Sequence, residues 1–448
     1  MPADRRNVLV VLDRRALLGG ALGLLALGAV PGLAGCGSAP DRDGAAGTAG
    51  TRLAADVSRE DVGLTEAADL AAVVAGLRGF GAELHRVSAA TAANWTVSPL
   101  SMAIAFGMLR AGSRGRSAEQ LDAAFGWGPA ADPAGSPHRA LNALAADIVT
   151  TGPVEPGPAQ TPSGAPGPDP IVAVANGLFL AKGFPVEPDF LTILARQYGA
   201  DATALDFATG AAAATINDWV RAQTRDRIDK LFDDLDPSTK LVLANAVYLK
   251  TTWASQFDEA ATTTGAFRTA GGGSVQADLM SQRLEQVGYD ETADWQRVRL
   301  PYVGGELSMQ VVLPRKVVGE VAELTALIGP AVEPVLDGTG YVDLTLPRWD
   351  TASTIALLPA LAALGVTDLT DLAGMAPGLA VSDAIHRANV TVDERGTEAA
   401  AVTGIATETS AVVATPVAMT VDRPFSWAVL HEPSGTPVFA GHVVDPTT

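Results

Sequence analysis

Two nearly continuous apolar runs constrain the fold of this chain more than any other feature. Residues 171–180 and 241–249 are rich in valine, alanine and leucine, with few polar residues between them. A strand with one hydrated face alternates apolar and polar residues, whereas an unbroken apolar run is typical of a strand covered on both faces. We therefore expect both runs to be central strands that other elements cover on either side.

The remaining pattern places helices early and strands late. Apolar residues recur with helical spacing over 67–87, 98–110 and 211–223, while apolar and polar residues alternate over 342–346 and 390–393. Ser117 and Gln120 have the spacing of a capping box, which predicts a helix that starts after Ser117. Since no regular strand–helix–strand order is visible, the pattern favours an α+β fold over a doubly wound one.

The charge balance argues against nucleic acid as a partner. The net charge is −19, the isoelectric point is near 4.6, and no run of five or more basic residues occurs. Binding to phosphate backbones needs clustered lysine and arginine. For the same reason we expect no heparin-like polyanion as a partner.

The N-terminus has the features of an export signal. Residues 1–15 carry Arg5, Arg6, Arg14 and Arg15, residues 16–30 form a short apolar run, and the sequence Leu-Ala-Gly-Cys ends at Cys36. A charged start, a short apolar core and small residues before a cleavage point are typical of a signal peptide, and the run is short for a membrane span. Leu-Ala-Gly-Cys resembles the lipobox of bacterial lipoproteins, in which the cysteine is lipidated. The alternative is an ordinary signal peptide followed by a chance cysteine.

These features predict the organisation of the whole chain. We expect residues 1–35 to be a lipoprotein signal peptide, Cys36 to be lipidated, and 36–62 to be a flexible tether rich in small residues. The folded domain is expected over 63–448, with the Pro/Gly-rich stretch 153–170 as a surface insertion. The protein is then exported and held at the extracellular face of the cell membrane, or secreted, through either the general or the twin-arginine route.

No catalytic motif is visible. The five histidines form no HExxH motif and no close pair, and the chain contains neither a GxSxG elbow nor a serine three residues before a lysine. The single cysteine, at the lipobox, is not available as a nucleophile. We therefore expect a protein that is not an enzyme and needs no cofactor or metal.

Residues 394–415 do not resemble an ordinary helix or core strand. The segment holds small and β-branched residues, with no lysine, aromatic residue or proline, and Arg395 is its only arginine. Taken as a strand, every second residue from Thr397 to Thr407 is uncharged, whereas Glu398 and Glu408 have the other parity. Because alternate residues of a strand face opposite sides, one face could be buried in a sheet while the other stays hydrated. A surface loop of small residues is the simpler alternative.

Several motifs in a fixed order resemble the serpin family. Residues 394–401 resemble the hinge of inhibitory serpins, and 423–425 with 439–446 resemble the family's C-terminal signature. Further motifs resemble the start of helix B, the second strand of sheet A, the helix F region and the third strand of sheet A; they are 94–101, 176–179, 216–228, and 245–250 with Trp253. The resemblance covers the chain from about residue 64 to its end.

This resemblance implies a serpin fold and roles for individual residues. The implied fold has a large sheet A, two smaller sheets, about eight or nine helices, and an exposed reactive-centre loop over 394–416. Ser98, Ser101, Asn245 and His386 match the shutter beneath the opening of sheet A, and Trp253 matches the breach, where insertion begins. For His386 and Trp253, simple core packing is the alternative. The hinge residues are Glu394, Gly396, Thr397, Glu398, Ala399, Ala400, Ala401 and Thr403.

The resemblance also implies a mechanism and a partner. A serine protease attacks the loop, forms an acyl-enzyme, and is trapped covalently when the cleaved loop inserts into sheet A as a new strand. Family spacing places the cleaved bond at Ser410-Ala411, with Thr409 and Val412 as neighbouring candidates. Small residues there favour an elastase-like target, and a subtilisin-like target remains open. Serpins are usually monomers, so we expect a monomer.

Two other functions remain open at this stage. The first is a non-inhibitory serpin that acts as a chaperone or carrier; it predicts charged or bulky residues at the inward-facing hinge positions, which this chain lacks. The second is a substrate-binding lipoprotein of an uptake system, which predicts a two-lobed α/β pattern.

Overall fold

The computed structural model describes residues 50–89, 94–128, 137–150, 171–224, 226–335, 340–397 and 416–448. The chain divides into two units, Met1–Ala46 and Gly47–Thr448, and all described residues belong to the second. The proposed signal peptide, Cys36 and the stretch 153–170 lie outside the described residues.

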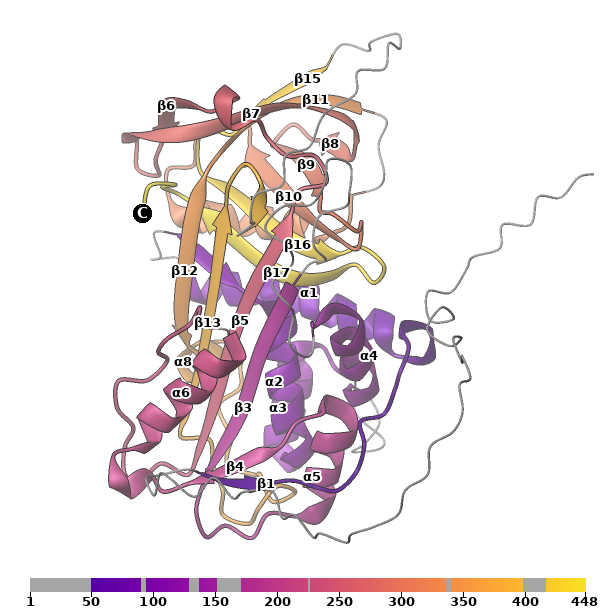
Figure 1. Cartoon of the computed structure of the whole chain (residues 1–448), viewed down its shortest axis with the longest axis vertical. Coiled ribbons are helices and arrows are strands. Elements are labelled where there is room, and N and C mark those ends of the chain that lie inside the picture. The colour runs from indigo at the N-terminus through magenta and orange to yellow at the C-terminus, as the bar shows by residue number, and fades with distance from the viewer. Residues whose placement is uncertain are drawn as a thin grey trace, which may run out of the picture. The chain divides into compact units, whose positions relative to one another are not determined.

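Three β-sheets form the strand-rich part of the described chain (Figure 1). The largest, which we call the main sheet, has seven strands in the order β1 (Thr51–Leu53), β4 (Ala202–Leu205), β3 (Ile171–Ala181), β5 (Leu241–Thr252), β14 (Gly396–Thr397), β13 (Asp383–Val392) and β12 (Trp349–Ala356). The second has six, in the order β2 (Trp95–Val97), β17 (Thr436–Val443), β16 (Phe425–His431), β10 (Leu307–Pro314), β9 (Trp295–Pro301) and β8 (Tyr289–Glu291). The third has four, in the order β15 (Val417–Thr420), β11 (Gly340–Pro347), β7 (Ser274–Val287) and β6 (Thr263–Arg268).

Eight α-helices accompany these sheets within the described residues. They are α1 (Leu70–Ser88), α2 (Pro99–Gly112), α3 (Gly115–Phe125), α4 (His138–Ile148), α5 (Pro188–Ile193), α6 (Ala212–Thr224), α7 (Thr325–Val332) and α8 (Leu357–Ala363). The predicted α+β class, with helices concentrated early and strands late, is confirmed. None of the helices in the described part of the chain has the combination of length and hydropathy that crossing a membrane requires.

The two apolar runs are the central strands β3 and β5, as predicted. Alternate residues of β5 belong to two separate hydrophobic clusters: Leu243 and Val247 pack in the large core that contains α2, whereas Val242, Ala244 and Ala246 pack with α6. The strand is therefore covered on both faces, with α6 in front of the main sheet in Figure 1 and α2 on its other side. Burial on both faces is the physical reason for an apolar run without alternation.

The N-terminal boundary of the fold differs from the prediction. Thr51–Leu53 pairs antiparallel with β4 and adds an edge strand to the main sheet. Arg59 and Glu60 are also bound to the fold, since Arg59 donates to Asn142 Oδ1 at 3.0 Å and Glu60 accepts from Arg139. The tether interpretation is therefore wrong for residues 50–62. This strand is held by backbone pairing at the edge of the sheet more than by burial of apolar side chains. Its small and polar residues therefore show no strand pattern in the sequence.

The predicted capping box at Ser117 is also wrong. Helix α3 begins at Gly115, so Ser117 lies inside it, and its hydroxyl accepts from the backbone N–H of Asp371 at 3.1 Å. The side chain of Ser117 therefore binds a loop that is distant in sequence and does not cap the helix.

Candidate functional site

Strands β5 and β13 of the main sheet are paired directly along most of their shared length and separate at one end. Strands β5 and β13 pair directly and in parallel from Val242 to Tyr248, opposite Asp383 to Asn389. Beyond this point they separate and β14 lies between them: Gly396 and Thr397 pair with Thr252 and Thr251 of β5, and Thr397 also pairs with Val392 of β13. Gly396 and Thr397, near the start of the segment 394–415, are therefore already a short strand of the main sheet.

A hydrogen-bonded cluster lies across the closed part of this junction. The backbone N–H of Ser98 donates to Nε2 of His386, on β13, at 3.1 Å, so Nε2 is the unprotonated ring nitrogen. Nδ1 therefore carries the hydrogen and donates to Oδ1 of Asn245, on β5. The amide of Asn245 donates to Ser101 O at 2.9 Å, to Ser101 Oγ at 2.7 Å, and to Oδ1 of Asn176 on β3. All four predicted shutter residues are brought together, and Asn176 joins them.

The N-terminus of α2 is the hub of this cluster. Ser98 is its N-cap, accepting from Ser101 N–H at 3.0 Å, and Pro99 occupies the first helical position. Through Ser98 and Ser101 the helix end is bonded to β13 on one side of the junction and to β5 on the other. A strand cannot enter here unless some of these buried hydrogen bonds break.

The cluster contains a neutral histidine. Burial lowers the pKa of His386 to about 3, because the charged imidazolium loses its hydration in the protein interior. Both ring nitrogens are already used as one acceptor and one donor, which only the neutral tautomer allows.

This neutral state predicts an acid-sensitive junction. A histidine in the unfolded chain titrates near pH 6.5, so between about pH 6.5 and 3 the unfolded chain binds a proton that the folded protein does not. Stability contributed by His386 is therefore present above this window and lost as the pH falls through it. We expect the apparent midpoint of thermal unfolding to fall between pH 7 and about 4, and to fall less in His386→Asn. His85, whose pKa burial also lowers to about 3, titrates in both proteins, so the difference isolates His386. Parallel curves for the two proteins would contradict the prediction.

Glu394 anchors the chain where it enters the sheet. Its carboxylate is only 3% exposed and receives a bidentate pair of hydrogen bonds from Arg348, at 2.8 and 2.6 Å, and one from Thr262. Burial alone would raise the pKa of Glu394, but the hydrogen bonds from Arg348 and Thr262 outweigh it, so the pKa is lowered. The carbonyl of Glu394 also accepts from Phe257 N–H at 2.9 Å. The carboxylate thus stays ionised and fixes the start of the loop.

Gly396 and Thr397 fill the open end of the junction. Gly396 has φ +153°, and a β-carbon there would lie 2.2 Å from the carbonyl oxygen of Thr251, so only glycine fits this approach. The side chain of Thr397 is fully buried, and its hydroxyl is 2.7 Å from the hydroxyl of Tyr302. Beneath it, Trp253 stacks on Tyr302 with ring centroids 4.4 Å apart.

Trp253 also holds the turn that leads into β14. Its indole N–H donates to Asp393 O and its backbone N–H to Arg395 O, each at 2.9 Å. The tryptophan is therefore both a core residue and a direct partner of the chain that enters β14, while its role at the start of insertion stays a prediction.

The structure locates some predicted site residues and not others. Glu394, Gly396 and Thr397 lie at the junction as described. Glu398, Ala399, Ala400, Ala401, Thr403, Ser410 and Ala411 lie outside the described residues. Three residues were missed by sequence reasoning. Asn176 could have been noticed, because it is an asparagine within an apolar run. Tyr302 and Arg348 have no distinctive local sequence pattern, because only the folded structure brings them to the site.

Fold and junction together define an α+β protein whose main sheet already holds the start of a long segment between two parallel strands. The family model described as "Serpin (serine protease inhibitor)" matches residues 75–446. The chain is 33% identical to the leukocyte elastase inhibitor of Homo sapiens over 376 residues, covering 79% of this chain and 94% of that protein, and 32% identical to Serpin-Z1C of Triticum aestivum, covering 79% and 90%. The crystal structure of the thermophilic serpin tengpin in the native state matches with a TM-score of 0.72 at 22% identity, covering 88% of this chain and 99% of that one.

The chain belongs to the serpin family. The predicted serpin fold, with one large and two smaller sheets and eight helices in the described residues, is confirmed. Serpins are protease inhibitors and in general not catalytic enzymes.

Proposed function

We propose that this protein inhibits a serine protease by suicide-substrate trapping. The protease cleaves the loop at Ser410-Ala411, and the freed segment that follows Thr397 then inserts between β5 and β13 as a full strand. The covalently attached protease is carried along and inactivated. In this proposal the protein is a single-use inhibitor and not an enzyme, and its partner is the protease.

One observation carries the proposal: Gly396 and Thr397 are already paired with β5, and Thr397 is also paired with β13. Extending this strand requires the direct β5–β13 pairing to open progressively, beginning where the two strands already diverge. Insertion would replace that one parallel pairing with two antiparallel ones, which gains backbone hydrogen bonds and buries small side chains. The cluster around Asn245 and His386 lies directly in the path, so it would act as the latch that keeps the sheet closed.

The target is proposed from the loop sequence. Residues 409–412 are Thr, Ser, Ala and Val, and no lysine or arginine occurs from 396 to 422. A protease with a shallow primary pocket accepts such residues, whereas a trypsin-like pocket with a buried carboxylate selects a cation. An elastase-like enzyme fits best, and a subtilisin-like enzyme is the second candidate.

Trapping is tested by mixing the full chain with pancreatic elastase and, separately, with subtilisin. We expect a band at the combined mass on a denaturing gel, and mass spectrometry of the released C-terminal peptide should show that it begins at Ala411. Catalytically inactive elastase, in which the active-site serine is blocked, serves as the control and should give no such band. Complete cleavage of the loop by both proteases without any covalent complex would refute trapping and favour a carrier or chaperone role.

We also propose that the protein is exported and anchored by a lipid on Cys36. The support is the sequence of residues 1–36, with its arginines, short apolar run and Leu-Ala-Gly-Cys. Expressed in a bacterial host supplied with radiolabelled palmitate, the full chain should carry label in the membrane fraction. Cys36→Ser should be unlabelled, while Ser38→Ala, two residues away, should be labelled like the parent. An unlabelled parent chain would contradict the lipid anchor.

A further inference from the structure

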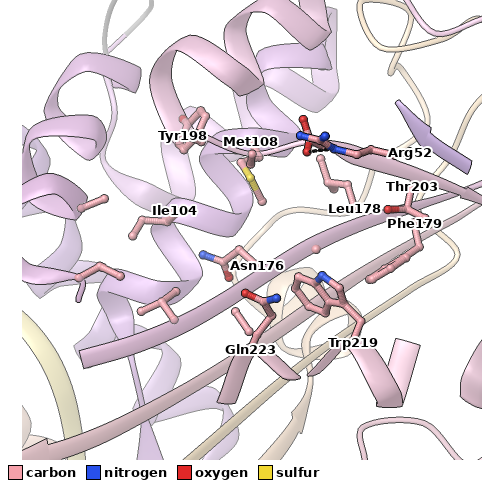
Figure 2. Close-up of a pocket in the computed structure, with 18 of the residues that line it drawn as sticks. Arg52, Ile104, Met108, Asn176, Leu178, Phe179, Tyr198, Thr203, Trp219 and Gln223 are labelled. Carbon is pink, nitrogen blue, oxygen red and sulfur yellow. Dashed lines mark hydrogen bonds and ion pairs between the residues drawn. The ribbon is translucent and has the colours of Figure 1, made fainter. Parts of the chain in front are cut away.

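A cavity of about 530 Å³ borders the main sheet along β3, on the side of this strand that faces away from β5 (Figure 2). Its lining includes the consecutive residues 174–179 of β3, together with residues of α2, α6, β4 and the chain around β1. Consecutive residues of a strand point to opposite faces. A cavity that touches six in a row must therefore pass around the edge of the strand, from one face of the sheet to the other.

The side chains around the cavity agree with this geometry. Figure 2 shows Ile104 and Met108, from α2, on one side of the β3 ribbon, and Trp219 and Gln223, from α6, on the other, with Asn176 between them. Helices α2 and α6 cover opposite faces of the main sheet. The cavity thus has an apolar wall behind the sheet and a wall with an indole and an amide in front.

The edge of β3 that faces this cavity has no partner strand over part of its length. β5 occupies the other edge from Ile171 to Leu180, and β4 joins the cavity-side edge only from Leu178 onward. At the far end, Val172 N–H donates to Thr150 Oγ1 at 3.1 Å and Val172 O accepts from Thr150 N–H at 2.9 Å. The backbone groups of Val174 and Asn176, two and four residues further, point the same way as those of Val172. Between Thr150 and β4, no described strand pairs with them.

The charged side chains of the lining already have partners. Arg52 forms an ion pair with Asp201 at 2.5 Å, and Arg59 is bound to Asn142 Oδ1 and O, each at 3.0 Å, with Asp61 nearby. Arg52, Arg59 and Asp201 are the charged residues of the lining. A charged occupant would find no unpaired counter-ion here, so the site fits an uncharged one.

We infer that this cavity binds an extended, uncharged peptide segment that adds to the free edge of β3 at Val174 and Asn176. Strand addition supplies main-chain hydrogen bonds, while alternate side chains enter pockets on the two faces. The free stretch between Val172 and Leu178 has room for about five residues at roughly 3.3 Å per residue. Side chains of one parity would contact Ile104 and Met108, and those of the other parity would contact Trp219 and Gln223. The inference does not depend on protease trapping.

The chain's own neighbouring segment is a poor occupant. The stretch that follows Thr150 contains seven prolines, at 153, 156, 158, 162, 166, 168 and 170. Proline has no N–H to donate to a strand edge. A partner peptide without proline is therefore the better complement to the edge.

The test uses a capped pentapeptide, acetyl-Thr-Leu-Thr-Leu-Thr-amide, titrated into the full chain by calorimetry. Two control peptides carry N-methyl groups, one on both leucine amides and the other on all three threonine amides. A peptide added at one edge uses the amides of one parity only, so one control should bind at least about tenfold more weakly and the other should bind like the parent. Equal affinity of all three peptides, loss of binding by both controls, or no binding of the parent at 1 mM would each overturn the inference. Loss by both is the result expected for insertion inside the sheet, where both edges of the peptide pair.

A variant of the protein tests the same hydrogen bonds by removing a donor from β3 and leaving the peptide unchanged. Val174→Pro removes an N–H that points into the cavity and is not used in the pairing with β5, whereas Val174→Thr keeps that N–H with nearly the same shape. We expect the parent peptide to lose at least about tenfold in affinity for Val174→Pro and less than about threefold for Val174→Thr. Unchanged affinity for Val174→Pro would overturn the inference. Thermal unfolding shows whether each variant is folded, and if Val174→Pro is not, the methylated peptides still decide on the parent chain.

Discussion

Ala401→Arg is expected to turn the inhibitor into a substrate. Thr397 is fully buried in the main sheet, so on insertion the side chains at every second position after it would face the same interior. Ala401 has this parity. An arginine there would bury a cation without a partner, which costs several kcal/mol and slows insertion relative to hydrolysis of the acyl-enzyme. We expect the yield of covalent complex with elastase to fall by at least about tenfold while loop cleavage continues at its normal rate.

Ala400→Arg is the matched control for this prediction. The same cation is introduced one residue earlier, on the parity of Glu398, which would point away from the interior that receives Thr397. Its complex yield should fall less than that of Ala401→Arg, because a long side chain on that face can extend its charge toward solvent. Equal loss of complex in both variants would show that the loop does not insert with this alternation.

Asn245→Ala is expected to destabilise the native protein strongly. The amide of Asn245 bonds to Ser101 and Asn176 and accepts from His386, and the residue is fully buried. Its removal leaves buried polar groups on both sides of the junction without a partner, at a cost of about 3 kcal/mol. We expect a lower midpoint of urea unfolding. Because the same hydrogen bonds hold β5 against β13, spontaneous conversion to loop-inserted or polymeric forms on mild heating should also be faster.

Asn389→Ala provides the comparison for Asn245→Ala. Asn389 lies on β13 opposite Tyr248 of β5, and its side-chain oxygen is buried and accepts no hydrogen bond from the described residues. Its loss should change the urea midpoint little, since no buried partner is left unpaired. Similar destabilisation by the two variants would mean that the cluster at Asn245 has no special role in keeping the sheet closed.

Strand β14, which is already formed in this structure, affects how insertion of the loop would begin. Glu394 is held by Arg348, and Trp253 binds the backbone at Asp393 and Arg395. These contacts fix the entry of the segment while Thr397 already occupies the first inward position. In the proposed mechanism, insertion therefore extends an existing strand. The conformational entropy cost of ordering the first inserted residues has already been met in the native protein.

Much of the fold follows from local patterns in the sequence. The apolar runs at β3 and β5 predict doubly covered strands because burial on both faces leaves no position for a polar residue. Helical spacing places α1, α2 and α6, whose apolar stripes face the core. The parity of the segment after Thr397 is also suggested by the sequence alone, since the two charged residues there, Glu398 and Glu408, share the parity opposite to that of Thr397, and the buried side chain of Thr397 agrees with it.

Other features depend on contacts between distant residues, and no local pattern contains them. The edge strand β1 forms because a free backbone edge of β4 is available, and its residues carry no strand signal. Arg348, between β11 and β12, and Tyr302, directly after β9, contact the hinge across 46 and 95 residues of sequence, so their roles appear only once the sheets are assembled. The neutral state of His386 likewise results from complete burial between α2, β5 and β13. The sequence by itself therefore determined that β3 and β5 are strands covered on both faces, where α1, α2 and α6 lie, and which residues of the loop can be buried. The tertiary structure alone decided that Gly396 and Thr397 are already in the sheet, because that depends on where β5 and β13 diverge.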